Sequence, residues 1–570
     1  MKTTYIILGL MLWTLPVLSQ KADVLVDFED KAEGNAIPVF SLEGSSAARA
    51  VVASDPLYAK NKVVHVTTSA DATESALNIR VVNLPDGLTL GDYDYLAFDY
   101  YRAETDPGHA IAYVSMNSKE VWRDSNTICY ENRGRWNRRV IPLEQLKGNT
   151  KTRIAPFRIG YLGGGKDYYI DNICLVRDID YGYNLDVPNT TLRHYADALG
   201  INVGVAMGDG QGFLFANGYA SQPESQLTRT LTRLFNLTVA ENDMKWEVIE
   251  PQQNHFDFTR GDQLVELAEG NGMKVRGHTL CWHSQLAGWV YNLKTRDEML
   301  AALKNHVKTV VSHYKGRVYE WDVCNEMIDA SQEDGLCRDL FYDVFGPDYL
   351  DSCFVWAHQA DPDARLVMND FLVEYDGDGK AMKLLELAVK MKRKGIPIDG
   401  VGFQCHCYWL GSIAQMKQSI KTLCNRYARY GLDVSFTEMD QGLSYSDRDK
   451  QAAWEAQAAD YRALMELIVE CPNVNSLIVW GLADPYSWRM SYDNTTQPLI
   501  LGDYLQAKPA YTAMLNVLKE ALEATGLNKV ETDHAAPVRQ GSIYNLAGQQ
   551  VDANYKGIII MNGKKYIREK

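Results

Sequence analysis

The sequence predicts an α/β fold, a (β/α)8 TIM barrel preceded by an all-β jelly-roll sandwich. Three observations support this prediction. The chain has 570 residues, more than a single hydrophobic core usually serves, so two or more domains are expected. Residues 22–178 contain many short strand-like runs and no long helical run. Beyond Pro188, strand-like runs alternate with amphipathic helical runs, which is typical of βα units on a parallel sheet.

The first residues have the pattern of a secretory signal peptide. Lys2 precedes an apolar run over 5–18, and Val17 and Ser19 predict cleavage before Gln20. The run is too short and too close to the N-terminus for a membrane span, and no cysteine follows that would carry a lipid anchor. We therefore expect a signal peptide at 1–19. The expected location is secreted, cell-surface or periplasmic, in a bacterium.

Residues 22–178 are expected to form the sandwich. Strand-like runs include 24–28, 95–100, 111–114 and 168–171. The opening Asp27-Phe28-Glu29 and the closing 169–173 resemble the end strands of carbohydrate-binding modules, in which such acidic residues often hold a structural calcium. The alternative is that these acidic residues are simply solvated. Trp122 and Trp136 could stack on sugar rings or pack in the core.

Residues 188–525 are expected to form the barrel. The strand-like runs are 201–207, 237–242, 274–282, 318–326, 365–370, 400–406, 433–440 and 476–482. The helical runs include 296–313, 379–394, 413–430, 452–470 and 508–525. Eight strands with helices between them fit a TIM barrel, in which functional sites lie at the carboxyl ends of the strands.

The last segment, 541–570, is expected to form a small β tail. Strand-like runs at 542–546 and 557–561 are followed by Asn562-Gly563, and an Asn-Gly pair between strand-like runs predicts a hairpin. Similar tails occur on many exported bacterial hydrolases.

Charge and cysteine content exclude some functions. The net charge of −15 and the pI near 5.3 argue against nucleic acid as a partner, because no basic surface is available to neutralise phosphates. The ten cysteines are scattered, which is not the pattern of a small disulfide-stapled domain. Cys405-His406-Cys407 resembles a metal cluster, but alternate residues of a strand point to opposite faces, so buried free thiols are favoured.

Two glutamates lie where predicted strands end. Glu326 closes the aromatic and β-branched run at 318–326, and Glu438 lies near the end of 433–440. Two carboxyl groups facing each other across a sugar are what glycoside hydrolysis requires, one as proton donor and one as nucleophile. We therefore expect Glu326 and Glu438 to be the catalytic pair.

Motifs at several predicted strand ends make this expectation specific. They are, in order, 241–246 (ENDMKW), 277–285 (GHTLCWHSQ), 321–326 (WDVCNE), 369–370 (ND), 404–406 (QCH), 437–440 (TEMD) and 480–484 (WGLAD) with Ser487-Trp488. In sequence and order they resemble family 10 glycoside hydrolases, the endo-β-1,4-xylanases. The resemblance covers the whole barrel and implies a retaining reaction, with carboxylates about 5–5.5 Å apart.

The resemblance and the chemistry imply a role for each residue. Glu326 would be the general acid and then the base, its protonated form favoured by the charge of Glu438. Glu438 would attack the anomeric carbon. Because Glu438 and Asp440 are two apart on a strand, they leave the same face, and His406 on the neighbouring strand could contact both. Asn325 matches the residue that binds the sugar 2-hydroxyl. Neighbouring side chains on a strand point to opposite faces, so the strand must break at Glu326 for Asn325 and Glu326 both to face the substrate.

A further group of residues is expected to bind the sugar chain. They offer polar groups to the sugar hydroxyls or indole rings to the apolar sugar faces. They are Glu241, Asn242, Lys245, His278, Trp282, Gln285, Gln404, Trp480 and Trp488. Trp246 and Trp321 are expected to pack in the core. No metal site is expected among these residues, and the reaction needs no cofactor. The expected partner is xylan or xylo-oligosaccharide.

Two alternatives stay open at this point. One is a β-1,4-glucanase on a related barrel with the same pair of glutamates, which would differ by the room it leaves for a hydroxymethyl group. The other is a polysaccharide-binding protein that has lost catalysis. That alternative expects Glu326 or Glu438 to be replaced, and both are present.

Overall fold

The chain folds into two compact units. The computed structural model describes residues 21–26, 40–43, 49–67, 70, 74–81, 84, 86–103, 113–116, 121–123, 133–143, 155–162, 165, 167–208, 225–375, 379–407, 412–443, 450–491, 497–525, 543–545, 550–551, 557–561 and 564–568. The first unit takes Met1–Tyr183 with Met490–Asn494 and Leu501–Ala507. The second takes Asn184–Arg489, Thr495–Ile500 and Lys508–Lys570.

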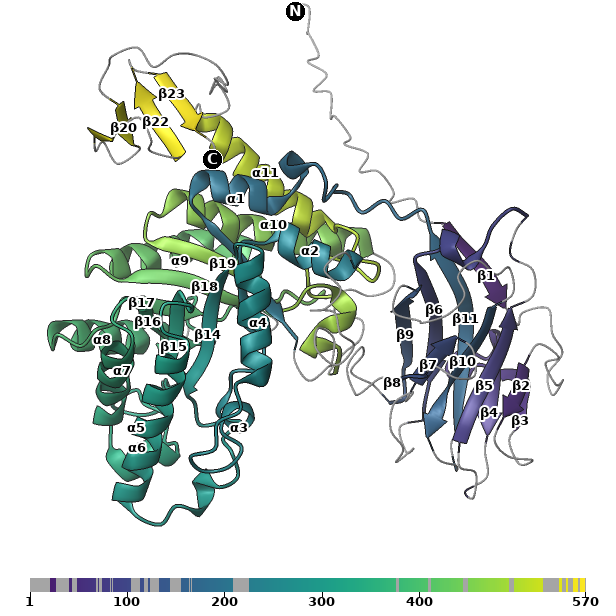
Figure 1. Cartoon of the computed structure of the whole chain (residues 1–570), viewed down its shortest axis with the longest axis horizontal. Coiled ribbons are helices and arrows are strands. Elements are labelled where there is room, and N and C mark those ends of the chain that lie inside the picture. The colour runs from purple at the N-terminus through teal and green to yellow at the C-terminus, as the bar shows by residue number, and fades with distance from the viewer. Residues whose placement is uncertain are drawn as a thin grey trace, which may run out of the picture. The chain divides into compact units, whose positions relative to one another are not determined.

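The first unit is built from two antiparallel sheets. A six-stranded sheet has the order β3-β4-β11-β6-β9 with β1 paired to β11, and a five-stranded sheet has the order β2-β5-β10-β7-β8. The strands are β1 Lys21–Val26, β2 Phe40–Glu43, β3 Arg49–Ser54, β4 Lys62–Thr67, β5 Glu74–Val81, β6 Tyr95–Tyr101, β7 Tyr113–Met116, β8 Val121–Arg123, β9 Trp136–Pro142, β10 Ala155–Leu162 and β11 Asp167–Arg177. The all-β prediction for this part of the chain is therefore confirmed (Figure 1).

Several sequence predictions for this unit concern residues outside the described part. The signal peptide at 1–19, the acidic residues Asp27 and Glu29, and the side chain of Trp122 all fall there. Within the described part, the indole Nε1 of Trp136 donates to Asp55 Oδ1 at 3.1 Å. The calcium site therefore stays a prediction.

The second unit contains a closed barrel of eight parallel strands in sequence order, surrounded by helices, as predicted (Figure 1). The strands are β12 Asn202–Met207, β13 Leu237–Ala240, β14 Lys274–Cys281, β15 Glu320–Asn325, β16 Arg365–Asp370, β17 Gly400–Phe403, β18 Asp433–Met439 and β19 Val474–Val479. Pairing of β12 with β19 closes the barrel. The helices are α1 Leu192–Leu199, α2 Gln226–Leu234, α3 Trp246–Ile249, α4 Thr259–Gly270, α5 Arg296–His313, α6 Leu340–Phe345, α7 Asp348–Ala360, α8 Lys380–Arg393, α9 Ile413–Ala428, α10 Lys450–Glu470 and α11 Pro509–Ala524.

Local sequence explains where the helices and strands form. Helix α5 begins after a capping box, in which Thr295 accepts from Glu298 N and the Glu298 side chain accepts from Thr295 N. Helix α11 begins with Pro509, whose missing N–H costs nothing at the first helical position. Strands such as β12 and β15 are buried along their whole length, because helices cover one face and the barrel interior the other.

Six of the eight predicted barrel strands end one to three residues earlier than expected, and two of them end just before a left-handed residue in the expected site. The run 318–326 ends as β15 at Asn325, and Glu326 has a left-handed backbone with φ of 57°. The run 400–406 ends as β17 at Phe403, and Cys405 has φ of 59°. A left-handed residue rotates the direction of the following side chains, so strand alternation no longer applies there. The break expected at Glu326 is present; the extension of β17 to His406 was wrong.

The barrel interior below the strand ends is filled by a charged cluster and a large ring. Arg276 on β14 pairs with Glu320 and Asp322 on β15, and all three side chains are buried. A Cβ on Gly277 would lie 2.1 Å from the Trp321 ring, so only glycine allows this indole to pack. Trp321 thus lies in the core, as predicted, and the interior gives the strand ends a rigid base.

The C-terminal residues form a four-stranded sheet of order β21-β20-β22-β23. The strands are β20 Ile543–Asn545, β21 Gln550–Val551, β22 Gly557–Met561 and β23 Lys564–Arg568. Met561 pairs with Lys564, so β22 and β23 are antiparallel neighbours, as the predicted hairpin requires, and Asn562-Gly563 lies outside the described residues. Among the helices in the described residues, none has the length and hydropathy that crossing a membrane requires.

Candidate active site

Glu438 is a buried carboxylate near the end of β18 that the surrounding residues keep ionised. Only 5% of the surface of this residue is exposed to solvent. Oε1 accepts from Asn369 Nδ2 at 2.7 Å, and Oε2 lies 3.1 Å from His406 Nε2. Burial raises the pKa of Glu438, but the hydrogen bond from His406 and the nearby His278 outweigh burial, and the net shift is downward. The pKa therefore favours a carboxylate, the form a nucleophile needs.

His406 lies between two carboxylates. Its Nδ1 is 3.0 Å from Asp440 Oδ2, opposite the contact that Nε2 makes with Glu438. Burial alone would lower the pKa of His406, but Asp440 and Glu438 together raise it to about 10. Asp440 Oδ2 also accepts from Trp488 Nε1 at 2.7 Å. The structure thus brings Glu438, Asp440 and His406 together as strand alternation predicts.

Glu326 follows β15 and is held by two donors. Oε2 accepts from Trp282 Nε1 at 2.9 Å, and Oε1 accepts from Gln404 Nε2 at 3.1 Å. The left-handed backbone is fixed by a hydrogen bond from Glu326 N to Asn369 O at 2.8 Å. Glu326 is partly exposed, in contrast to Glu438. Its carboxyl group is therefore oriented by residues of two other strand ends.

Asn325 connects the surroundings of the two glutamates. Its Oδ1 accepts from Asn369 Nδ2 at 2.9 Å and lies 3.4 Å from Gln404 Nε2. Asn369 also donates to Glu438, and Gln404 also donates to Glu326. One continuous set of side-chain hydrogen bonds therefore runs from the first glutamate to the second. The set spans the ends of β15, β16, β17 and β18.

A polar group lies beyond β13 and β14. Lys245 Nζ donates to Asn242 Oδ1 at 2.6 Å and to Gln285 Oε1 at 2.7 Å. The same ammonium lies 4.8 Å from the ring centroid of Trp282, which contacts Glu326. Glu241 precedes this group and is 5% exposed. These four polar side chains are among those predicted to bind sugar hydroxyls, and hydrogen bonds join Asn242, Lys245 and Gln285.

His278 and the two predicted platform tryptophans surround the carboxylates. His278 Nδ1 is 3.0 Å from Asp322 Oδ2. Trp480 is 5% exposed and packs edge-on to His278 and His406, with ring centroids 5.5 and 6.3 Å apart. Trp488 is partly buried, with its ring centroid 5.2 Å from that of His406. The two tryptophans therefore lie at the strand ends and also pack against the histidines.

Sequence reasoning missed several residues that hold the site. Asn369 contacts Asn325 and Glu438, although the sequence indicates only the Asn-Asp motif at 369–370 and no role for this side chain. Asp370 is buried, its Oδ1 accepting from Lys380 Nζ at 2.8 Å, and burial raises its pKa to about 6. Glu374 is fully buried, and its Oε1 accepts from Cys405 N at 2.6 Å, at the left-handed residue before His406. The Asn-Asp pair at 369–370 was the sequence signal that could have indicated Asn369. No motif in the sequence indicates Lys380 or Glu374.

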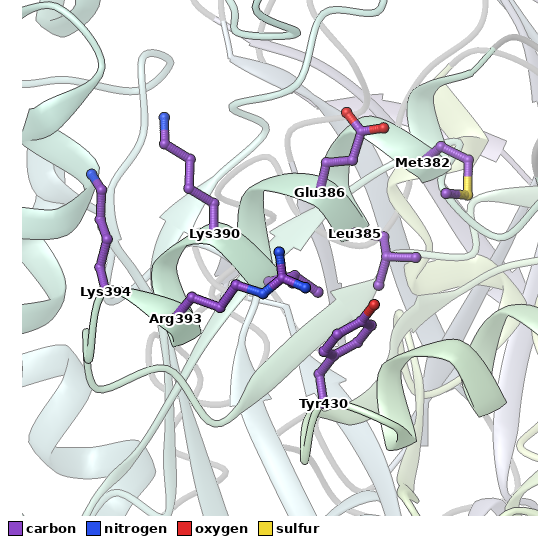
Figure 2. A pocket seen from close by; sticks show the side chains of 8 residues that line it. Met382, Leu385, Glu386, Lys390, Arg393, Lys394 and Tyr430 are labelled. Atoms are coloured by element: carbon purple, nitrogen blue, oxygen red, sulfur yellow. The ribbon is translucent and has the colours of Figure 1, made fainter.

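The helix layer contains a hollow that is separate from these residues. It has a volume of about 490 Å³ and is lined by α8, Lys394 and Tyr430 (Figure 2). Arg393 extends between Glu386 and Tyr430, with its guanidinium 5.7 Å from the tyrosine ring centroid. None of the predicted site residues lines it. The strand ends remain the place where the chemistry-bearing side chains converge.

Comparison with known proteins agrees with this geometry. Residues 191–517 match the sequence profile of Glycosyl hydrolase family 10. Endo-1,4-beta-xylanase B of Thermotoga neapolitana is 36% identical over 342 residues, which are 59% of this chain and 93% of that protein. Beta-1,4-xylanase of Dictyoglomus thermophilum is 42% identical over 45% of this chain and 74% of that protein.

A solved structure shows the same barrel. Xylanase 10B from Thermotoga petrophila, in complex with xylobiose, is 33% identical, with a TM-score of 0.52 over 58% of this chain and 97% of that one. The family profile covers more than half of the chain, and the resemblance seen in the strand-end motifs is confirmed. The chain belongs to glycosyl hydrolase family 10.

Proposed function

We propose that the chain is a secreted, retaining endo-β-1,4-xylanase that hydrolyses internal β-1,4-xylosidic bonds of xylan or xylo-oligosaccharide. The observation that carries the proposal is a buried carboxylate, Glu438, kept ionised by His406, while a second, partly exposed carboxylate, Glu326, follows β15, which β16 and β17 separate from β18. The xylanases among its relatives and the xylobiose complex support xylan as the substrate. The signal-like residues at 1–19 support export.

In the first step, a Glu438 oxygen attacks the anomeric carbon of the sugar. Glu326 gives its proton to the glycosidic oxygen, the glycosidic bond breaks, and the shortened chain leaves with a new hydroxyl group. The product is a glycosyl ester of Glu438. Asn325, whose Oδ1 accepts from Asn369, would bind the 2-hydroxyl, a contact that should strengthen as positive charge develops on the ring.

In the second step, Glu326 acts as a base. It takes a proton from water, the water oxygen attacks the anomeric carbon, and Glu438 leaves as a carboxylate. Two displacements restore the β configuration. The charged ring of His406 stabilises that departing carboxylate, and Trp282 and Gln404 keep Glu326 aimed in both steps.

Paired substitutions test these two roles. Glu438→Ala should abolish cleavage, and azide should restore turnover with an α-glycosyl azide as product, since azide takes the place of the missing nucleophile. Glu326→Ala should instead yield a β-glycosyl azide, since the glycosyl-enzyme still forms. The products are identified by NMR. A Glu438→Ala variant that still cuts at full rate would show that another residue is the nucleophile.

Substrate choice is tested by comparing initial rates on xylan and on carboxymethyl cellulose. The xylanase proposal expects faster cleavage of xylan. Faster cleavage of the cellulose would overturn it in favour of a β-1,4-glucanase with the same pair of glutamates. Sequencing the exported protein from its N-terminus should give Gln20 first, and retention of Met1 would exclude cleavage at the expected position.

We also propose that residues 22–178 form a carbohydrate-binding module. The two antiparallel sheets and the partly buried Trp136 support this proposal. The full chain carrying Glu438→Ala should be retained on insoluble xylan without cutting it. Adding Trp136→Ala should reduce that retention, and unchanged retention would exclude this tryptophan as a sugar contact.

A further inference from the structure

Three buried thiols meet behind the strand ends of the active site. Cys281 is the last residue of β14, Cys324 lies in β15 and Cys353 lies in α7. Their exposed fractions are 3%, 1% and 0%. The three sulfur atoms all lie within 4.8 Å of one another, and no other group of three or more His, Cys, Asp or Glu side chains in the described residues is arranged so closely. We call these residues the thiol triad.

The fold brings the triad together from both of its layers. Cys281 and Cys324 are register partners in the parallel pair of β14 and β15, so their side chains leave the same face of the sheet. Helix α7 packs on β15 and supplies the third sulfur. All three cysteines are free, and a disulfide would join only two of the three sulfurs. The triad is therefore a preformed set of three sulfur ligands.

We propose that the thiol triad binds one thiophilic d10 cation, of the class that includes Cd²⁺, Hg²⁺ and Cu⁺. Thiolates select soft ions of this kind over hard ions that prefer oxygen. Sulfurs that share an ion at about 2.3 Å in a trigonal plane lie about 4 Å apart, so the triad needs to contract by no more than about 1 Å. With a divalent ion, three thiols lose three protons and three metal–sulfur bonds form, leaving one net negative charge.

The charges around the triad explain why a cation is the expected ligand. Asp339 and Tyr349 interact electrostatically with the thiols, and the Tyr349 hydroxyl donates to Asp339 at 3.1 Å. Neither group carries a positive charge that could neutralise a thiolate. A bound cation supplies the missing positive charge. The competing explanation, three cysteines packed as small apolar residues, predicts no ion binding at stoichiometric concentration.

Occupancy of the triad should also reduce the proposed xylanase activity, a consequence that rests on the proposed function. Cys281 immediately precedes Trp282, which donates to Glu326, and Cys324 immediately precedes Asn325. Drawing the sulfurs together therefore pulls on both strand ends. A displacement of about 1 Å at catalytic groups can lower a rate about 100-fold.

The test is a titration of the reduced full-length chain with CdCl₂ under anaerobic conditions. Thiolate-to-cadmium charge-transfer absorption should saturate at one equivalent, with protons released into a weakly buffered solution. Cys353→Ala should remove this signal, and Cys324→Ala serves as a second variant if the first does not fold by circular dichroism. Cys471→Ala, at a buried cysteine that follows α10, should bind cadmium as the parent chain does. Absence of the signal, or an unchanged signal in both triad variants, would overturn the proposal.

Measuring xylan hydrolysis in the same samples separates the two claims. Activity of the parent chain should fall as cadmium binds, whereas Cys353→Ala should keep its activity at the same cadmium concentration. Binding without inhibition would leave the site in place and overturn its coupling to the strand ends. A metal-free chain that does not cut xylan would count against the proposed function and not against the triad.

Discussion

Replacing His406 by glutamine tests whether a charged imidazole keeps the nucleophile ionised. His406 contacts Glu438 through Nε2 and Asp440 through Nδ1, and the two carboxylates raise its pKa to about 10. The ring is therefore an imidazolium throughout the neutral and mildly acidic range. Glutamine keeps an amide donor at this position but carries no charge, so the substitution removes mainly the electrostatic part of the interaction.

The expected shift follows from the contacts of Glu438. Burial raises the pKa of Glu438, and His406 is the first of the groups that lower it. A hydrogen bond to a charged group contributes about 1.5–3 kcal/mol, and one pKa unit corresponds to about 1.36 kcal/mol. Because attack requires the carboxylate, the acidic limb of the profile of kcat/KM against pH should move up by about one to two pH units in His406→Gln.

Stability gives a second readout of the same charge. The pKa of His406 is raised from 6.5 to about 10 on folding, which corresponds to roughly 5 kcal/mol in favour of the native state at most. This stabilisation is fully present below pH 6.5 and is lost as the pH rises through about 10. The difference in Tm between the parent chain and His406→Gln should therefore be largest near pH 6 and should shrink towards pH 10.

Initial rates on soluble xylan between pH 4 and pH 9 provide the assay. The matched control is His313→Gln, at a histidine of α5 whose Nε2 lies 2.7 Å from Asp262 Oδ1 and which belongs to no part of the site. This control should leave the acidic limb where it is. If His406→Gln lowers the rate but its acidic limb coincides with that of the parent chain, the charge of His406 does not keep Glu438 ionised.

Two further substitutions test the packing beneath the site. Gly277→Ala should lower the stability of the barrel by about 1–3 kcal/mol or more, because its Cβ would lie 2.1 Å from Trp321. The control Gly288→Ala, whose Cβ would have no atom within 4 Å, should change the stability by less than about 0.5 kcal/mol. Equal Tm values for the two variants would contradict this prediction. Asp370→Asn should destabilise the chain by about 3–5 kcal/mol, because the buried ammonium of Lys380 loses its carboxylate partner, and Asp370→Asn with Lys380→Met should recover most of that loss in calorimetry.

Much of the barrel could be predicted from the sequence because its signals are local. The strand Arg365–Asp370 and the helix Arg296–His313 were predicted to the residue. Runs of β-branched and aromatic residues mark strands buried on both faces, and capping residues mark helix ends. The placement of Glu438 and Asp440 on one face follows from the two-residue period of a strand.

The remaining features depend on how neighbouring strands are placed across the barrel. Asn369 reaches both Asn325 and Glu438 because β15 and β16 are paired in register, and no period along one strand reveals this. The end of β17 was placed too late because Cys405 is left-handed without being glycine or asparagine, the residues that usually indicate such a backbone. Glu374, which binds Cys405 N, lies on a different loop altogether.

The left-handed backbone at Cys405 has a consequence for engineering this enzyme against heat. A cysteine in that conformation carries conformational strain that glycine would relieve. Screens that select only for protein that remains folded after heating should therefore favour Cys405→Gly. The same replacement gives the backbone before His406 more freedom, so such survivors should be more thermotolerant and slower catalysts. Selections for this barrel therefore need to score turnover alongside heat resistance.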